Sequence, residues 1–263
     1  MTMNRITVLL LQIGVGLAFF LLWHVATVYP IFDQPRDVQF FFSTPVDVLA
    51  RVVQELRSGE IWHHVLITLA ETVLAFLSGA GGGILLGFVF ARNDGLAAVF
   101  DPYIKAANAL PRVVLAPMFA LWFGLGIWSK VALGFTLVFF IVFFNVYQGV
   151  REVPQVVLAN ARMLGMSRRQ LLRHVYWPAA LTWVFSSLHT SVGFALVGAV
   201  VGEYLGSSAG LGYKIHEAES VFDVTGVFAG MLILSVFVLI MDVAVVMIER
   251  RLLVWRPAPA RPA

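Results

Sequence analysis

The sequence predicts an all-α membrane protein with six transmembrane helices, and three observations lead to this prediction. Of the 263 residues, 60% are hydrophobic and only 13% are charged, about half the charged share of a typical soluble domain. The mean hydropathy of the chain is +0.87. The apolar residues also form runs long enough for helices of about 20 residues, the length that crosses a bilayer.

The predicted spans are separated by short basic, acidic or proline-containing segments. They cover residues 6–29, 62–91, 102–123, 128–148, 176–202 and 224–248. The third span is the least regular, because Pro111 and Pro117 interrupt the hydrogen-bond ladder of a helix. The sixth carries a single acid, Asp242, which we expect to be buried.

Basic residues are distributed unevenly over the loops that alternate between these spans. One side, with both termini and the loops 92–101 and 149–174, carries eleven arginines, and the other side carries five basic residues. The positive-inside rule therefore places both termini in the cytoplasm. We expect the tail, residues 251–263, to be a disordered cytoplasmic segment.

Residues 1–60 are expected to contain the first transmembrane helix and a segment on the outer, periplasmic side. Thr44 suits the N-cap and Pro45 the first position of a short amphipathic helix. We expect this helix to lie outside the bilayer core.

Three glycines, Gly79, Gly83 and Gly87, recur at every fourth position of the second span. They share one helix face, which lets another helix approach closely. A glycine run is also typical of phosphate loops, but these require a following Gly-Lys pair, and the sequence has none. We therefore predict helix packing at this face.

Several function classes find no support in the sequence. The chain has no cysteine, which excludes disulfide frameworks and thiolate metal sites. Its histidines are adjacent or scattered, so we expect neither a metal site nor a catalytic constellation. The arginines gather in a few segments, which indicates control of membrane topology rather than nucleic-acid binding.

The segment 149–174 is the most informative connector and carries five arginines. Pro154 suits the first turn of a helix, and Gly165 is well placed to end it. Ser167 then caps a second helix, and Gln170 completes a capping box. The expected apolar stripe of the first helix consists of Val157, Ala161 and Leu164. An ordinary basic connector is the alternative interpretation.

The connector resembles the EAA signature of ABC importer permeases, which reads Glu-Ala-Ala, three residues, Gly, nine residues and Ile-x-Leu-Pro. The residues that match in register are Ala161, Gly165 and Pro178. Val175 replaces the isoleucine, whereas Ala159, Asn160 and Trp177 depart from the glutamate, middle alanine and leucine. A salt bridge made by that glutamate is therefore unavailable here.

Four further segments resemble permeases for aliphatic sulfonates, taurine and nitrate, and relatives that serve thiamine precursors and riboflavin. They are residues 109–131, 143–153, 201–213 and 221–231. With them the resemblance covers roughly residues 45–250. It is highly specific for the family and indicates the substrate only weakly.

The resemblance implies a type I ABC importer permease fold, with a transmembrane type-1 domain at residues 61–250 and a coupling loop at about 150–174. It implies a cytoplasmic coupling helix that contacts an ATPase through Ala159, Asn160, Ala161, Arg162, Leu164, Gly165, Met166, Ser167 and Pro178. The implied partners are a second permease copy in a homodimer, two ABC ATPase subunits that bind ATP and Mg, and a periplasmic substrate-binding protein. We expect no cofactor on this chain, no enzyme activity, and a location in the bacterial inner membrane.

Three residues are candidates for the translocation path: Arg112, Asn145 and Glu203. Arg112 is the most plausible contact for an anionic substrate, because sulfonates and nitrate are anions. Its alternative role is a structural pair with Glu71, Glu203 or Asp242. We also expect Glu203, Glu217 and Glu219 to face outward, toward a binding protein. An ion-gradient-driven secondary transporter is the alternative function, although no repeat relates the two halves of the chain.

Overall fold

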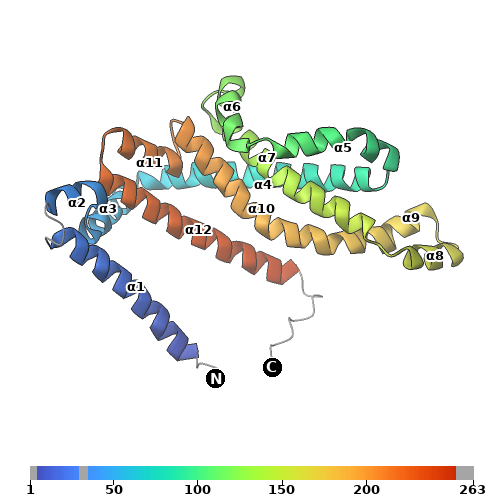
Figure 1. Cartoon of the computed structure of the whole chain (residues 1–263), viewed down its shortest axis with the longest axis horizontal. Helices are drawn as coiled ribbons and strands as arrows, with labels where there is room; N and C mark the ends of the chain where they lie inside the picture. Colours follow the sequence, from blue (N-terminus) through green and yellow to red (C-terminus); the bar gives the residue numbers. More distant parts are fainter. Residues whose placement is uncertain (1–4, 30–34, 253–263) are drawn as a thin grey trace.

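The computed structural model describes residues 5–29 and 35–252, which form helices joined by short loops (Figure 1). The elements are α1 (Arg5–Val28), α2 (Pro35–Phe42), α3 (Pro45–Ser58), α4 (Ile61–Ala91), α5 (Asp94–Ala109), the 3-10 helix η1 (Arg112–Leu115), α6 (Ala116–Phe123), α7 (Ile127–Arg151), α8 (Gln155–Met163), α9 (Arg168–Leu171), the π-helix η2 (Leu172–Tyr176), α10 (Trp177–Leu205), α11 (Leu211–Ser220) and α12 (Val224–Leu252). The predicted helical fold is confirmed for these residues. The predicted disorder of the tail concerns residues 253–263, which lie outside the described part.

Five helices of the described chain are long and apolar enough to cross a membrane. They are α1, α4, α7, α10 and α12, which agree with the predicted first, second, fourth, fifth and sixth spans. A sixth span results if the bent pair of α5 and η1–α6 counts as one crossing. The prediction of an all-α membrane protein is therefore confirmed.

The third predicted span is wrong in its start and in its continuity. α5 begins at Asp94 rather than at residue 102, and the chain bends by 86° between α5 and η1–α6. The early start follows from Asn93, whose side chain caps the helix by accepting a hydrogen bond from Leu96 N at 3.1 Å. The bend follows from Pro111, which has no N–H and holds Leu110 in an extended conformation.

The centre of the molecule is the packing of α4 against α7 and of α7 against α10. Val138, Val142 and Val146 of α7 are fully buried there. A Cβ on Gly79 would lie 2.7 Å from Val138 Cβ, and a Cβ on Gly83 would lie 2.8 Å from Val142 Cβ. A Cβ on Gly87 would lie 2.7 Å from Phe143 O. Each of the three glycines thus lets the backbones of α4 and α7 approach closely.

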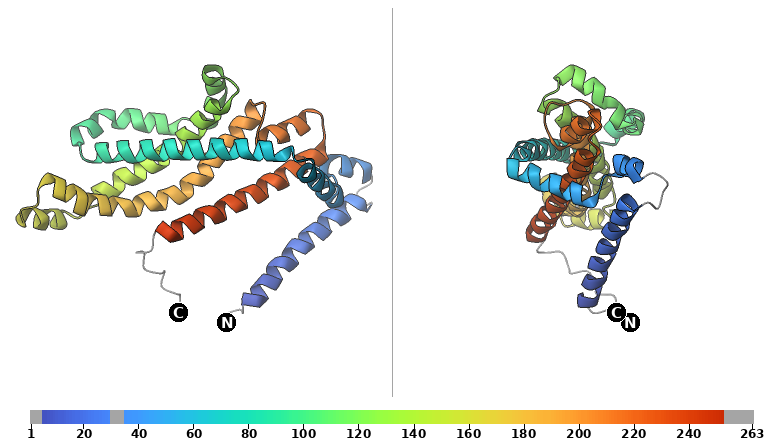
Figure 2. Two further views of the ribbon diagram at one scale, coloured as in Figure 1. Left: turned by 180° about the vertical axis from the view of Figure 1, so that it is seen from behind. Right: turned by 90° about the vertical axis from the view of Figure 1, so that its left-hand side faces the viewer.

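The N-terminal helix α1 diverges from the bundle and meets it only near α2 and α3 (Figure 2). At this junction Trp23 Nε1 donates to Phe42 O at 3.3 Å, and the Trp23 ring lies 5.5 Å from that of Phe228 on α12. Thr44 is the N-cap of α3, and its hydroxyl accepts from Asp47 N. The sequence did not predict α2.

Two groups of short helices lie at opposite ends of the bundle (Figure 1). α2, α3 and α11 gather where α4 and α12 begin, and we call this the α3–α11 end. α8 and α9 lie at the other end, together with the turn between α4 and α5, and we call this the connector end. The polar side chains considered below belong to these two ends.

Candidate functional site at the two ends of the bundle

The connector between α7 and α10 is shaped by one glycine. Gly165 has a φ of +76°, a conformation that favours glycine. Gly165 N donates to Arg162 O at 3.0 Å and Met166 N donates to Ala161 O at 3.1 Å. These two bonds form a Schellman motif, which satisfies the last carbonyls of α8 and turns the chain back.

The second half of the connector begins with a capping box. Gln170 N donates to Ser167 Oγ at 3.3 Å, and Ser167 N donates to Gln170 Oε1 at 2.8 Å. The helix that starts there continues through η2 into α10, so the helix of the fifth span begins earlier than predicted, in the connector. η2 precedes Pro178, and a π-type shift is a usual response of a helix to a proline that cannot donate to its ladder.

The connector has its own small apolar core, formed by Val153, Leu158, Ala161 and Leu171. The predicted apolar stripe is therefore partly wrong: Leu158 points inward, whereas Val157 and Leu164 are exposed. The reason is that the Schellman turn lifts Leu164 out of the helix face. Ala159, Asn160, Arg162 and Pro178 are exposed, and Met166 is half-buried.

The tip of the connector exposes two large apolar side chains. Met163 is 83% and Leu164 is 79% exposed. Arg162, Arg168 and Arg169 adjoin them in the sequence and are also exposed. An apolar tip with a basic surround is typical of a docking surface for another protein.

At the α3–α11 end, four buried polar side chains of α4, α7 and α10 interact, and we call them the buried polar cluster. Its members are Thr68, Glu71, Lys130 and Glu203, each at most 1% exposed. Thr68 Oγ1 donates to Glu203 Oε1 at 2.6 Å. Glu71 lies near Glu203 and Lys130, and its Oε2 is buried without a hydrogen-bond partner among the described residues. Charged groups at this depth are costly and indicate a function in membrane proteins.

The buried polar cluster also holds backbone groups of the first turn of α11 and of the loop between α6 and α7. Gly212 N donates to Glu203 Oε2 at 2.7 Å, and Leu211 N donates to Thr68 Oγ1 at 2.9 Å. Lys130 Nζ donates to Gly126 O at 3.1 Å and also to Leu125 O. The cluster is therefore a junction of membrane-spanning helices and loops.

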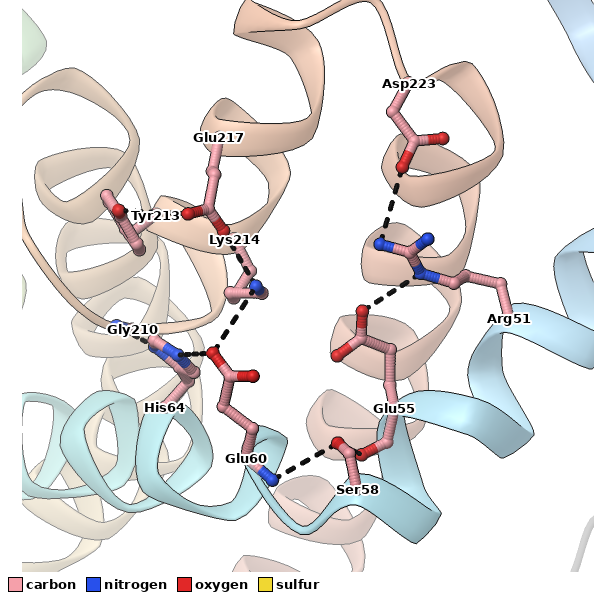
Figure 3. A network of polar contacts seen from close by, with 10 residues as sticks. All are labelled: Arg51, Glu55, Ser58, Glu60, His64, Gly210, Tyr213, Lys214, Glu217 and Asp223. Carbon is pink, nitrogen blue, oxygen red and sulfur yellow. Dashed lines mark hydrogen bonds and ion pairs between the residues drawn. The ribbon is translucent and has the colours of Figure 1, made fainter.

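Charged side chains connect α3, α4, α11 and α12 just beyond this cluster (Figure 3). Arg51 pairs with Glu55 at 3.0 Å and with Asp223 at 3.5 Å. Lys214 pairs with Glu217 at 2.7 Å. All five line a cavity of about 200 Å³. These five side chains are two cations and three anions, so the surface is polar with a slight excess of acidic groups.

The contact between Lys214 and Glu217 shifts the pKa of both side chains. Burial works to lower the pKa of Lys214, but the hydrogen bond and charge of Glu217, with the charges of Glu55 and Glu60, raise this pKa above its ordinary value. The hydrogen bond from Lys214 in turn lowers the pKa of Glu217. Both groups are therefore charged around neutral pH.

The three residues expected on the translocation path have separate partners. Arg112, at the start of η1, donates to Asn108 O at 3.2 Å and to Asn108 Oδ1, and its guanidinium lies 5.1 Å from the Phe140 ring centroid. Its Nε is buried without a hydrogen-bond partner among the described residues. Asn145 is half-buried and donates to Ile141 O of its own helix at 2.8 Å.

Two sequence-based expectations about acidic residues are wrong. Glu203 does not face outward, because its carboxylate is enclosed by α4 and by the backbone of α11. Asp242 is exposed rather than buried, because α12 lies on the periphery of the bundle. Glu217 and Glu219 are exposed at the α3–α11 end.

The sequence analysis missed Thr68 and Lys130 as functional candidates. A signal was present, since Thr68 and Glu71 are three residues apart and so share a helix face. Lys130 lies at the start of the predicted fourth span, 128–148, and precedes a long uncharged run. Within residues 5–29 and 35–252, no group of three or more candidate ligands is placed to hold a metal ion.

A family model described as the binding-protein-dependent transport system inner membrane component matches residues 79–254, more than half of the chain. The chain belongs to this family. Its members are importer permeases, which favours ATP-driven import over the ion-gradient-driven alternative. The matched residues begin within α4, so this inner membrane component carries Thr68 and Glu71 ahead of the matched region.

Several named permeases are similar to this inner membrane component. The putative aliphatic sulfonates transport permease protein SsuC of Bacillus subtilis is 34% identical over 213 residues, or 81% of this chain and 77% of that protein. The formylaminopyrimidine transport permease protein ThiX of Halalkalibacterium halodurans is 32% identical over 82% of this chain and 86% of that protein. The taurine transport system permease protein TauC of Escherichia coli is 26% identical over 89% and 84%.

The fold is also similar to a solved structure, the MetNI methionine ABC transporter in an inward-facing conformation. The TM-score is 0.57 at 18% sequence identity, covering 73% of this chain and 93% of that chain. This likeness supports the predicted importer permease fold.

Proposed function

We propose that this permease acts as one of two identical copies in an ATP-driven importer. Two ATPase subunits, which carry ATP and Mg²⁺, would bind at the connector end, and a substrate-binding protein would dock at the α3–α11 end. The connector end and both termini would face the cytoplasm, as the excess of arginines on that side favours.

The observation that carries this proposal is the form of the connector. Its Schellman turn, capping box and small apolar core make it rigid, and it is joined to α10 without a break. Its exposed apolar tip, Met163 and Leu164, has no cover in the described chain. A rigid element with such a tip suits α8 to act as the coupling helix that transmits closure of the ATPase to the spans.

Docking of the ATPase can be tested by placing a charge at this tip. Leu164→Asp would bury an unpaired charge at the contact, so we expect at least about tenfold weaker binding of the ATPase. The matched control is Val221→Asp, which changes an exposed apolar residue at the α3–α11 end. Retention of the ATPase on the purified permease is the measurement, and equal retention by both variants would contradict the proposal.

The second permease copy is supported by the apolar face of α5, η1 and α6. Large side chains are exposed there: Leu110, Val113, Val114, Leu121, Trp122 and Phe123. In a pair of copies this face would be covered in part by the partner and in part by lipid. The native mass of the purified complex tests this arrangement, and a complex with a single permease would contradict it.

For the substrate we propose a small organic anion, and for Arg112 the role of an anion contact. SsuC and TauC are named for aliphatic sulfonates and taurine. Arg112 lies at the bend before α6 with a buried Nε that lacks a partner among the described residues. A guanidinium with a free donor suits the recognition of a sulfonate or carboxylate.

Uptake of labelled taurine and riboflavin into proteoliposomes that contain the complex tests this substrate class. Arg112→Gln should lower taurine uptake by about tenfold or more, because it removes the charge of a charge-assisted hydrogen bond. ATP hydrolysis should remain. Lys105→Gln is the control, since Lys105 is an exposed cation of α5 that already pairs with Asp101. Uptake of riboflavin in place of taurine would contradict the proposed substrate class.

A further inference from the structure

The first turn of α11 is bound by side chains of the membrane-spanning helices. Three consecutive backbone N–H groups donate outward: Gly210 to His64 Nδ1 at 3.0 Å, Leu211 to Thr68 and Gly212 to Glu203. The first N–H groups of a helix have no partner within the helix. Here α4 and α10 supply those partners, and all the groups involved are buried.

Two glycines allow this contact. A Cβ on Gly210 would lie 2.2 Å from the Glu203 carboxyl carbon, and Gly210 has a φ of +113°. A Cβ on Gly212 would lie 2.4 Å from Val200 O. Only glycine at these two positions lets the backbone at the start of α11 lie this close to the Glu203 carboxyl group. Such an approach fixes the position of α11 relative to α10.

Lys130 ties a second loop to the same cluster. Its fully buried ammonium donates to the carbonyls of Leu125 and Gly126, and its side chain packs against Gly202, next to Glu203, where a Cβ would lie 2.9 Å from Lys130 Cγ. The loop between α6 and α7 and the loop between α10 and α11 thus share one anchor. Because a buried polar group that loses its hydrogen-bond partner costs about 1–3 kcal/mol, separating these loops from the cluster would be costly.

α10 connects this anchor to the other end of the molecule. Glu203 lies near the end of the continuous helical run that begins with Arg168 in the connector. A run of this length spans more than about 50 Å at 1.5 Å per residue. A displacement of the connector is therefore carried along one continuous helical run to Glu203, and from there to α11.

We propose that Thr68, Glu71, Lys130 and Glu203 are positioning residues that make α11 follow the movement of α10. Through them, ATPase closure at the connector would change the surface at the α3–α11 end, and docking of the binding protein there would reach the ATPase by the same route. This inference rests on the proposed function. It goes beyond that function because it assigns the coupling between ATPase closure and binding-protein docking to the buried polar cluster.

Thr68→Val tests the inference, because it removes the hydroxyl that joins Leu211 N to Glu203 and keeps the size of the side chain. The complex of permease, ATPase and binding protein is reconstituted in nanodiscs, and ATP hydrolysis is measured with and without the binding protein. We expect the stimulated-to-basal ratio to fall by about tenfold, since a buried backbone donor loses its partner. Basal hydrolysis and the yield of the complex should stay at the wild-type level.

Two variants make the test specific. Thr72→Val alters a threonine one turn further along α4, equally buried, whose hydroxyl donates only to Thr68 O within the helix. Its stimulated-to-basal ratio should equal that of the wild type. Thr68→Ser restores the hydroxyl and should restore the ratio.

The outcomes separate this inference from the proposed function. If the wild-type complex is not stimulated by a binding protein, the proposed function fails. If the wild type is stimulated and Thr68→Val keeps the ratio, the inference is overturned. It is also overturned if Thr68→Val lowers basal hydrolysis or the yield of the complex as much as it lowers the ratio, because the role of Thr68 is then only structural.

Discussion

The two ends of the bundle are built in opposite ways. At the α3–α11 end, ionisable side chains are buried and bonded to the backbone of neighbouring segments, as Glu203 is to Gly212 N. At the connector end, polar groups lie outside, four apolar residues form the core, and Met163 and Leu164 are uncovered. The interior of one end is held by hydrogen bonds of polar side chains, and the interior of the other end is apolar.

This contrast indicates how sensitive each end is to substitution. The backbone lies very close to this buried polar network, so substitutions that add atoms at the α3–α11 end should lower the stability of the permease. The connector depends on one turn and a small core, so changes there should affect docking more than stability. The predictions below test this contrast, from the largest expected effect to the smallest.

Gly210→Ala should be the most damaging small substitution in the chain. Its methyl group would lie 2.2 Å from the Glu203 carboxylate at a φ of +113°, so overpacking adds to backbone strain. We expect a loss of about 3 kcal/mol in the free energy of unfolding. The midpoint of thermal unfolding of the purified permease measures this effect.

Gly81→Ala is the control for that measurement. No heavy atom would lie within 4 Å of its Cβ, and alanine favours the helix by up to about 1 kcal/mol. We expect an unchanged or raised midpoint for this variant. An equal loss for Gly81→Ala and Gly210→Ala would show that the contact with Glu203 does not stabilise the α3–α11 end.

Gly83→Ala should have an intermediate effect, since it acts in the middle of the bundle. A Cβ there would lie 2.8 Å from Val142 Cβ and 2.9 Å from Phe139 O, and we expect a loss of about 2 kcal/mol from overpacking. The neighbouring Gly82 has its nearest contact at 3.4 Å. Gly82→Ala should leave the thermal midpoint almost unchanged, and a similar loss in both variants would contradict close packing at Gly83.

The sequence was sufficient to predict features that depend on local chemistry. The long apolar runs predict that α7 and α12 are membrane-spanning helices. The Ser167 capping box and the Gly165 turn follow from residues only a few positions apart. Each of these features depends on hydrogen bonds or burial within one segment. They would form in a similar way in another fold.

The remaining features depend on segments that are distant in the sequence. Glu203 looks like an exposed loop acid until Thr68 and Gly212 are placed around it, and these contacts span up to 135 residues. The bend at Pro111 was foreseen as an irregularity, but its angle is set by how η1 and α6 pack against α7. Burial of a charge is a tertiary property, so no local pattern could assign it.

Gly165→Ala should change the connector end by a smaller amount. A Cβ there would have no heavy atom within 4 Å, so the cost is only that of a left-handed backbone, about 1 kcal/mol. Asparagine tolerates this conformation better than alanine. We therefore expect ATPase retention to decrease from wild type through Gly165→Asn to Gly165→Ala, with little change in thermal stability. Equal retention by the three proteins would show that the turn does not position the docking surface.

The smallest effect should come from Lys214 and Glu217, which lie at the α3–α11 end but on its surface. The pKa of Glu217 is lowered below its ordinary value of 4.5, so its contribution to stability is present above that pH and is lost as the pH falls through the lowered pKa. The pKa of Lys214 is raised above 10.5, so its contribution is present below that pH and is lost as the pH rises through the raised pKa.

Glu217→Gln should cost less than about 1 kcal/mol near pH 7, because the pair is partly exposed. The difference in thermal midpoint between wild type and variant should shrink in acid below pH 4.5, and a difference that persists there would mean that Glu217 acts through packing rather than through its charge.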